Sequence, residues 1–143
     1  MSYDNNNVFA RILRGEIPCE RIYENEFVLS FMDIMPQADG HCLVIPKVLT
    51  TNIFDAEPSI FEPLFAAVQV VGNAAKLAFK ADGITIMQFN GEAAGQTVFH
   101  LHVHILPRKI GIPLRPHTGT MESTEIIKKN AERIREVLAR SAV

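Results

Sequence analysis

The feature that most constrains this chain is a run of alternating residues between Val98 and Leu106. From position 100 to 104 histidine alternates strictly with an apolar residue, and these three histidines are most of the five in the chain. A period of two predicts a β-strand, with His100, His102 and His104 on one face and apolar side chains on the other. The apolar face belongs to a core, so the histidine face needs a separate explanation.

Three explanations of the histidine face are open on the pattern alone. His-x-His on a strand supplies two ligands to a zinc ion, but the outer two rings would lie about 13 Å apart and could not share one ion. A solvent-facing polar strand is the second explanation, although Thr, Lys or Glu would serve it equally well. The third is a row of imidazoles that faces an anionic substrate, in which one ring attacks and its neighbours carry charge or move protons.

The segment just before the run favours the third explanation. Residues 90–97 read NGEAAGQT, a loop of small residues whose backbone N–H groups can approach a ligand closely. Gln96 and Thr97 add side-chain donors to this loop. A hairpin connection would have a similar composition, so the loop alone is weak evidence. Beside three histidines, it predicts a phosphate-binding site.

Composition narrows the kinds of partner. The chain has 143 residues, with 14 Lys and Arg against 16 Asp and Glu and a formal net charge of −2. We therefore expect no nucleic-acid or membrane partner, because a general basic field is lacking and no stretch reaches the roughly 20 apolar residues of a membrane span. The first residues, MSYDNNN, lack the pattern of a secretory signal. Cys19 and Cys42 form no paired framework, which favours reduced thiols and a cytoplasmic location.

The remaining periodicities predict a single α+β domain over residues 1–143. A short helix should begin at Val8 and end at Gly15, where a left-handed cap costs little. The other expected elements are strands at 21–24, 27–32, 41–46, 84–89 and 98–106, a helix at 62–80 and a charged helix at 123–139. Because loop connections dominate, an antiparallel sheet with helices packed on one face is favoured over a parallel βαβ arrangement.

Several segments together resemble one known family. Residues 100–106, HLHVHIL, resemble the His-φ-His-φ-His-φ-φ signature (φ apolar) of the histidine triad (HIT) superfamily, and Gly95-Gln96-Thr97 stands where that family has Gly-Gln-Ser/Thr. The segments FARI (9–12), GEIP (15–18), FMDIMP (31–36) and HCLVIPK (41–47) are similar to its nucleotide-binding, Hint-like branch. The similarity covers a core of about residues 8–107 and leaves 108–143 as a C-terminal extension. It implies a HIT-like fold.

The resemblance also implies a reaction. The protein would be a nucleotidyl hydrolase or transferase that acts on an α-phosphorus linked to a nucleoside. Our hypothesis within this class is a purine nucleoside phosphoramidate hydrolase that releases a nucleoside monophosphate. His102 would be the nucleophile and form a nucleotidyl-histidine intermediate, while His104 would contact the phosphate and assist proton transfer to the leaving group. His100 would orient His102, partly through its backbone carbonyl, and His41 would lie close by in a proton relay.

The nucleotide would be held by residues that match the family's binding positions. Asp33 would accept hydrogen bonds from the ribose hydroxyls. The phosphate side would comprise Asn90, Gly95, Gln96 and Thr97, and the apolar cleft for the base would comprise Val8, Phe9, Ile12, Phe31 and Ile34. Without the resemblance, the aromatic and aliphatic members of this set fit a core equally well, Asp33 is an ordinary loop carboxylate, and His41 is a satisfied histidine at a strand start.

The same resemblance bears on metal, assembly and the alternatives. Zinc-binding members carry Cys-x-x-Cys near the start, completed by histidines that match His41 and His100. Those cysteine positions are Asn7 and Ala10 here, so we expect no structural zinc and no cofactor. Members of the branch are homodimers, and the helix at 62–80 with the fourth strand would supply the interface. A dinucleoside polyphosphate hydrolase and a nucleotide-binding scaffold with little turnover remain as alternatives, and His117 is assigned no role.

Overall fold

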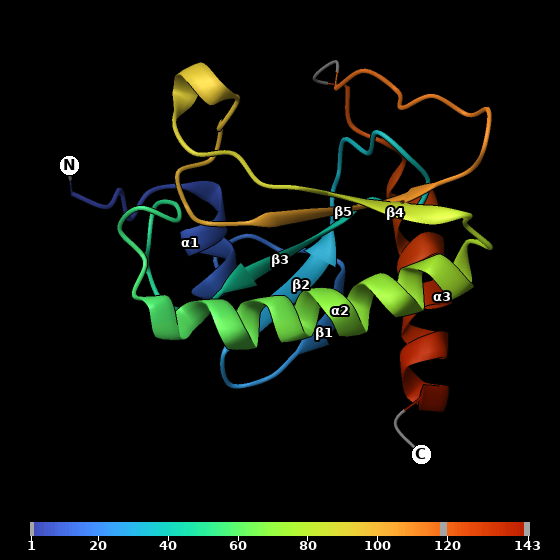
Figure 1. The fold of residues 1–143 in the computed structure, drawn as a ribbon, viewed down its shortest axis with the longest axis horizontal. Helices are drawn as coiled ribbons and strands as arrows, with labels where there is room; N and C mark the ends of the chain where they lie inside the picture. The colour runs from blue at the N-terminus through green and yellow to red at the C-terminus, as the bar shows by residue number, and fades with distance from the viewer. Residues whose placement is uncertain (1, 118–119, 142–143) are drawn as a thin grey trace.

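A computed structural model describes residues 2–117 and 120–141, and its centre is one five-stranded antiparallel sheet (Figure 1). The strands are β1 (Arg21–Glu24), β2 (Val28–Met32), β3 (Cys42–Pro46), β4 (Gly83–Met87) and β5 (Val103–Arg108), in the order β1-β2-β3-β5-β4. The helices are α1 (Val8–Leu13), α2 (Phe61–Ala78) and α3 (Thr124–Ser141), with short 3₁₀ turns η1 (Pro58–Ile60) and η2 (Glu92–Ala94). The predicted α+β fold is confirmed. None of the described helices is both long and apolar enough to cross a membrane.

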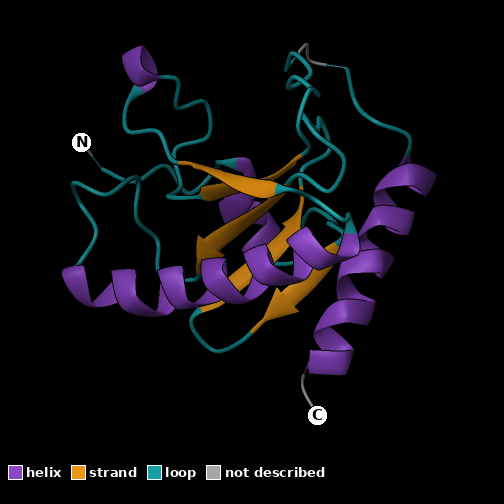
Figure 2. Cartoon of the chain, turned by 45° about the vertical axis from the view of Figure 1, so that its right-hand side comes forward, coloured by secondary structure: helices purple, strands orange, loops and turns teal. Residues whose placement is uncertain are grey.

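Both faces of the sheet are buried. Because side chains alternate along a strand, β2 sends Val28 and Met32 into the core shared with α2 and α3, and Leu29 and Phe31 into a second core shared with α1. The long helix α2 lies across one face of the sheet, as Figure 2 shows. The expectation of helices on one face therefore holds for α2 and α3, whereas α1 packs on the opposite face. His104 has the parity of the α1 face, since its neighbours Val103 and Ile105 are in the larger core.

Helix α1 stands where the sequence predicted it. The side chain of Asn7 accepts a hydrogen bond from the backbone N–H of Ala10 (2.9 Å) and so caps the first turn. The helix is followed by Gly15 at φ +78°, a left-handed conformation that favours glycine. Its buried side chains, Phe9 and Ile12, enter the second core and fix α1 above β2 and β3.

The prediction of a strand from Val98 was wrong in its first half, because β5 begins only at Val103. The β3 ladder pairs Val44 with Val103, and before that point the chain leaves the sheet. The backbone N–H of Leu101 donates instead to the carbonyl of Thr50 (2.9 Å), in the segment that follows β3. The three histidines therefore do not form one row on a strand face.

Candidate active site

A cavity of about 190 Å³ opens on the α1 face of the sheet, and we call it the histidine pocket. Many of the residues expected from the sequence to bind a nucleotide line it together. These are Val8, Phe9, Ile12, Phe31, Asp33, Ile34 and Thr97, with the histidines His102 and His104. The pocket is therefore an apolar slot from α1 and β2 that ends on two imidazoles.

The first of these imidazoles has a defined tautomer. His102 Nδ1 lies 2.6 Å from the backbone carbonyl oxygen of His100, and because a carbonyl only accepts, Nδ1 carries the proton. The lone pair is then on Nε2. Burial lowers the pKa of His102, so the ring is neutral at neutral pH. The edge of the ring packs against Phe9, with centroids 4.9 Å apart, which fixes its plane.

The second imidazole belongs to a short relay whose tautomers follow from one backbone group. The N–H of Gln37 donates to His41 Nδ1 (3.0 Å), so the proton of His41 is on Nε2. That Nε2 lies 2.9 Å from His104 Nδ1 and 3.4 Å from Asp33 Oδ2. His104 Nδ1 therefore accepts, and His104 presents an Nε2–H as a donor.

Burial changes what the histidines can do. It is the largest of the causes that lower the pKa of His41 to about 3 and that of His104 to about 3. Of the two roles expected for the rings beside His102, carrying charge or moving protons, the lowered pKa values argue against the first, because at neutral pH the rings are uncharged donors and acceptors. What these rings supply is a hydrogen-bond donor or acceptor at a fixed position, and not positive charge.

His100 acts through its backbone, and its ring points elsewhere. Its Nε2 donates to the carbonyl of Pro46 (2.9 Å), and its Nδ1 accepts a hydrogen bond from the hydroxyl of Tyr3. Burial lowers the pKa of His100 to about 4. The sequence offered no signal for Tyr3, which precedes every motif. The carbonyl that holds His102 is therefore fixed by a buried ring anchored at two ends.

The two histidines that match zinc ligands of other family members lie far apart. His41 directly precedes β3, whereas His100 binds the carbonyl at its last residue, so the two rings sit at opposite ends of a strand about 13 Å long. They could not complete one tetrahedral site, which corrects the pairing inferred from the resemblance. Asn7 caps α1 and Ala10 is buried in it.

A different group of side chains could hold a metal ion in the described part of the chain. Ligand atoms of Asp33, His41 and His104 lie within 4.8 Å of one another. Two of these atoms, His41 Nε2 and His104 Nδ1, already share a hydrogen bond, so an ion would have to replace that proton. The sequence did not predict this group.

Gln96 lies behind the pocket and not in it. Its Nε2 donates to the carbonyls of Thr51 (2.8 Å) and Val98 (3.1 Å), and its Oε1 accepts from the N–H of Gly91 (2.8 Å) and from Asn52 (3.3 Å). Both polar ends are occupied, which corrects the expectation of a free side-chain donor for a phosphate. Gln96 shapes the loop from within.

Asn90 and Gly95 also serve the shape of the 90–97 loop. The Oδ1 of Asn90 accepts from the N–H of Ile53 (3.0 Å), and its Nδ2 donates to Gln88 (2.8 Å). Gly95 has φ +101° and donates its N–H to the carbonyl of Glu92 (3.0 Å). Of the expected phosphate-side residues, Thr97 is the one that lines the pocket.

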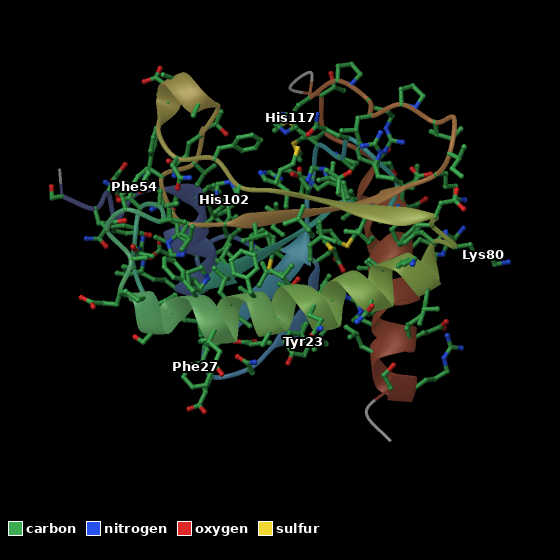
Figure 3. All side chains as sticks on the ribbon, viewed as in Figure 1. Tyr23, Phe27, Phe54, Lys80, His102 and His117 are labelled. Carbon is green, nitrogen blue, oxygen red and sulfur yellow. The ribbon has the colours of Figure 1, made fainter. Side chains whose placement is uncertain are left out.

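The segment after β5 completes the site in a way that the sequence did not reveal. We call residues 113–122 the strap, of which 113–117 and 120–122 are described. The N–H of Arg115 donates to the carbonyl of Gln37 (2.7 Å), and that of Glu122 donates to Ile34 (2.8 Å). Between these anchors His117 lines the histidine pocket, and Figure 3 shows its position relative to His102. The strap therefore holds the loop that carries Asp33 and orients His41.

Comparison with known proteins agrees with this geometry. The model of the HIT domain family matches residues 14–111. The chain belongs to the HIT family. Over 96% of its length it is similar to the crystal structure of a Hit-like protein involved in cell-cycle regulation from Bartonella henselae, at 52% identity with a TM-score of 0.91 and 99% of that chain covered.

Two further relatives carry names that describe a function. A hypothetical histidine triad nucleotide-binding protein from Sulfolobus tokodaii has a TM-score of 0.85 at 32% identity, with 92% of this chain and 91% of that chain covered. Adenylylsulfatase HINT3 of Arabidopsis thaliana is 39% identical over 105 residues, 73% of this chain. The match spans only 53% of the length of HINT3, about half of that protein.

Proposed function

We propose that this HIT protein is a nucleotide hydrolase that cleaves at the α-phosphorus of nucleoside phosphoramidates or related nucleotidyl conjugates. The observation that carries the proposal is the unprotonated Nε2 of a neutral, fixed His102 at the end of an apolar slot. A neutral imidazole is a competent nucleophile at neutral pH. The named relative HINT3, an adenylylsulfatase, is 39% identical over 105 residues of this chain.

In the first step His102 Nε2 attacks the α-phosphorus, and the bond from phosphorus to the leaving nitrogen breaks. The new P–N bond gives the imidazole a positive charge, which the His100 carbonyl stabilises through Nδ1–H. The Nε2–H of His104 donates to a phosphate oxygen, where negative charge accumulates. The leaving amine gains a proton that comes from solvent, and His104 would assist this transfer.

In the second step water attacks the same phosphorus and the bond to His102 breaks. The products are a nucleoside monophosphate and the neutral imidazole, and the proton of water leaves to solvent. The purine would lie in the apolar slot that Phe9, Ile12 and Phe31 line. Asp33 would accept from the ribose hydroxyls, since its Oδ1 is held by the N–H of Met35 (2.8 Å) and keeps further lone pairs.

The test is turnover of adenosine 5′-phosphoramidate, followed by release of AMP, with intact-mass analysis of the quenched enzyme. We expect a covalent adduct of one AMP that maps to His102, and a fall in kcat/KM of at least about 10³-fold for His102→Ala. Phe27→Ala, an exposed turn residue, is the control. Wild-type turnover by His102→Ala would refute the nucleophile. Binding of AMP without turnover would favour a scaffold, and a preference for dinucleoside polyphosphates would favour the other hydrolase.

Assembly and metal independence are parts of the same proposal. A homodimer is supported by apolar side chains that α2 exposes, Phe65 and Leu77, and by Ile86 on the edge strand β4. Sedimentation should give a dimer, and Leu77→Asp should give a monomer. Turnover should survive chelators; a loss that zinc restores would point instead to the Asp33, His41 and His104 group. A cytoplasmic location stays a prediction.

A further inference from the structure

A second and larger cavity, of about 530 Å³, lies where residues 107–115 pass over the end of α2 and the side of α3. We call it the basic cavity. Four cationic side chains line it: Arg108, Lys109, Arg115 and Arg133. The loop that precedes β3 closes it with Asp39, the one carboxylate among its lining residues. None of the motifs read from the sequence falls here.

The concentration of charge is the first reason to expect a ligand. Four of the 14 Lys and Arg residues line this cavity with one of the 16 Asp and Glu residues, in a chain of net charge −2. Asp82 lies nearby and accepts the backbone N–H of Ile110 (2.8 Å), but it does not line the cavity. Gathered like charges repel one another, so a multivalent anion would be strongly favoured in this space.

The orientation of the guanidinium groups is the second reason. Arg133 lies over the ring of Phe79, 4.2 Å from its centroid, and its Nη2 donates to the carbonyl of Ala78 (2.7 Å). Arg115 pairs with Asp39 through Nη1 (3.1 Å). A guanidinium carries five N–H donors, so each of these groups is held in place while donors remain for a phosphate. Side chains that are already ordered bind at a smaller entropic cost.

We propose that the basic cavity is a binding site for a compact polyphosphate anion, distinct from the histidine pocket. Arginine forks match the tetrahedral oxygens of phosphate, and four cations call for more than one phosphate group. The volume is within the range of small-molecule pockets. This proposal does not depend on the proposed hydrolase function, because it uses none of the pocket histidines.

The experiment titrates the full chain with inorganic triphosphate at low salt, by calorimetry and by amide NMR. The variants are Arg133→Gln and, in an exposed position that tolerates change, Lys109→Gln. The matched control is Arg135→Gln on the same helix, whose guanidinium donates to the carbonyl of Arg21 (2.6 Å) and pairs with Glu20 (3.6 Å), toward β1. Circular dichroism melts show whether each variant folds.

We expect amide shifts at the end of α2, at residues 107–115 and on the facing turns of α3. Affinity should fall at least about tenfold for Arg133→Gln, several-fold for Lys109→Gln, and less than twofold for Arg135→Gln. The proposal is overturned if wild type shows no millimolar binding, if the shifts are confined to the histidine pocket, or if Arg135→Gln weakens binding as much as Arg133→Gln. It is also overturned if Arg133→Gln abolishes self-association while triphosphate does not bind, which would assign the cavity to a second copy.

Discussion

The histidine pocket and the basic cavity are neighbours with opposite chemistry. Arg115 lines the cavity and His117, two residues further along the strap, lines the pocket. Among the described residues that line the histidine pocket there is no Lys or Arg, and burial keeps the imidazoles of His102 and His104 neutral. A fixed cation would hold an anionic substrate and the transition state alike, whereas oriented neutral donors act where charge develops. On our proposals, the basic cavity would bind an anion through its positive charge, whereas the histidine pocket would act through neutral donors in fixed orientations.

The sharpest way to break this comparison is to remove the oriented relay. His41→Ala deletes the donor to His104 Nδ1, so His104 loses the preference for a proton on Nε2. We expect kcat to fall about 10²-fold with KM within threefold, as is typical for a positioned proton-bearing group. Steady-state kinetics with a phosphoramidate would measure this split.

The control for the relay is spectroscopic. In wild type, imidazole ¹⁵N shifts should show the proton of His41 on Nε2 and that of His102 on Nδ1, and the latter should persist in His41→Ala. If both tautomers of His104 are equally populated in wild type, the fixed orientation is wrong and the contrast with the basic cavity disappears.

The next largest effect on kinetics should come from Phe9, in the apolar part of the histidine pocket. Phe9 packs edge-on against both Phe31 (5.4 Å between centroids) and His102 (4.9 Å). Phe9→Ala should raise KM about tenfold and lower the free energy of unfolding by about 3 kcal/mol, since a buried ring is lost. Phe27→Ala, at 52% exposure in a turn, is the matched control and should change neither value appreciably. A loss of stability in Phe9→Ala with an unchanged KM would mean that Phe9 is only part of the core.

Low pH should destabilise the folded protein, because buried imidazoles stay neutral in it. The pKa of His41 and of His104 is lowered to about 3 and that of His100 to about 4, whereas an unfolded histidine titrates near 6.5. The unfolded chain therefore binds more protons between about pH 3 and 6.5, and stability is complete above this window and lost as pH falls through it. Each histidine contributes up to about 1.4 kcal/mol per pH unit.

Urea unfolding at pH 7.5, 6 and 5 measures that loss. His41→Ala should have a shallower dependence on pH than wild type, because one such group is absent. A flat profile in wild type would show that the rings do not stay neutral in the folded state.

Ionic strength should change the turnover at the histidine pocket very little and should change anion binding at the basic cavity strongly. Between about 50 and 300 mM salt, kcat/KM for a phosphoramidate should change less than about twofold, because no described cation lines the pocket. Triphosphate binding to the basic cavity should weaken about tenfold or more over the same range. Parallel titrations of both would test this, and a steep salt dependence of kcat/KM would erase the distinction.

How far the sequence predicted this site depends on whether a residue acts through its side-chain pattern or through the backbone. Period-two and helical patterns predicted β1 to β4 and α1, and the motif predicted the pocket-lining set that includes Phe9, Asp33 and His102. Gln37 acts through its N–H, which every residue but proline has, so no motif could reveal it. Tyr3 and Arg115 reach the site only through contacts distant in sequence.

The errors have a similar cause. A period of two predicted a strand from Val98, but the chain before Val103 forms hydrogen bonds with residues after β3 and leaves the sheet. Gln96 has the composition of a phosphate donor, yet four loop groups occupy its amide. Periodicity describes one helix or strand at a time. The start of β5 and the hydrogen bonds of Gln96 depend instead on contacts between segments distant in sequence.

The strap also limits which fragments of the chain can keep the geometry of the site. A fragment limited to residues 14–111, the span of the family match, would keep all three triad histidines. It would lack Tyr3, which fixes the His100 ring, the aromatic wall from Phe9, and Arg115, which ties down Gln37. Grafting that span into another scaffold would move the histidine signature without the contacts that fix its tautomers. Those contacts extend from Tyr3 to Glu122, and the core beneath them also needs α3.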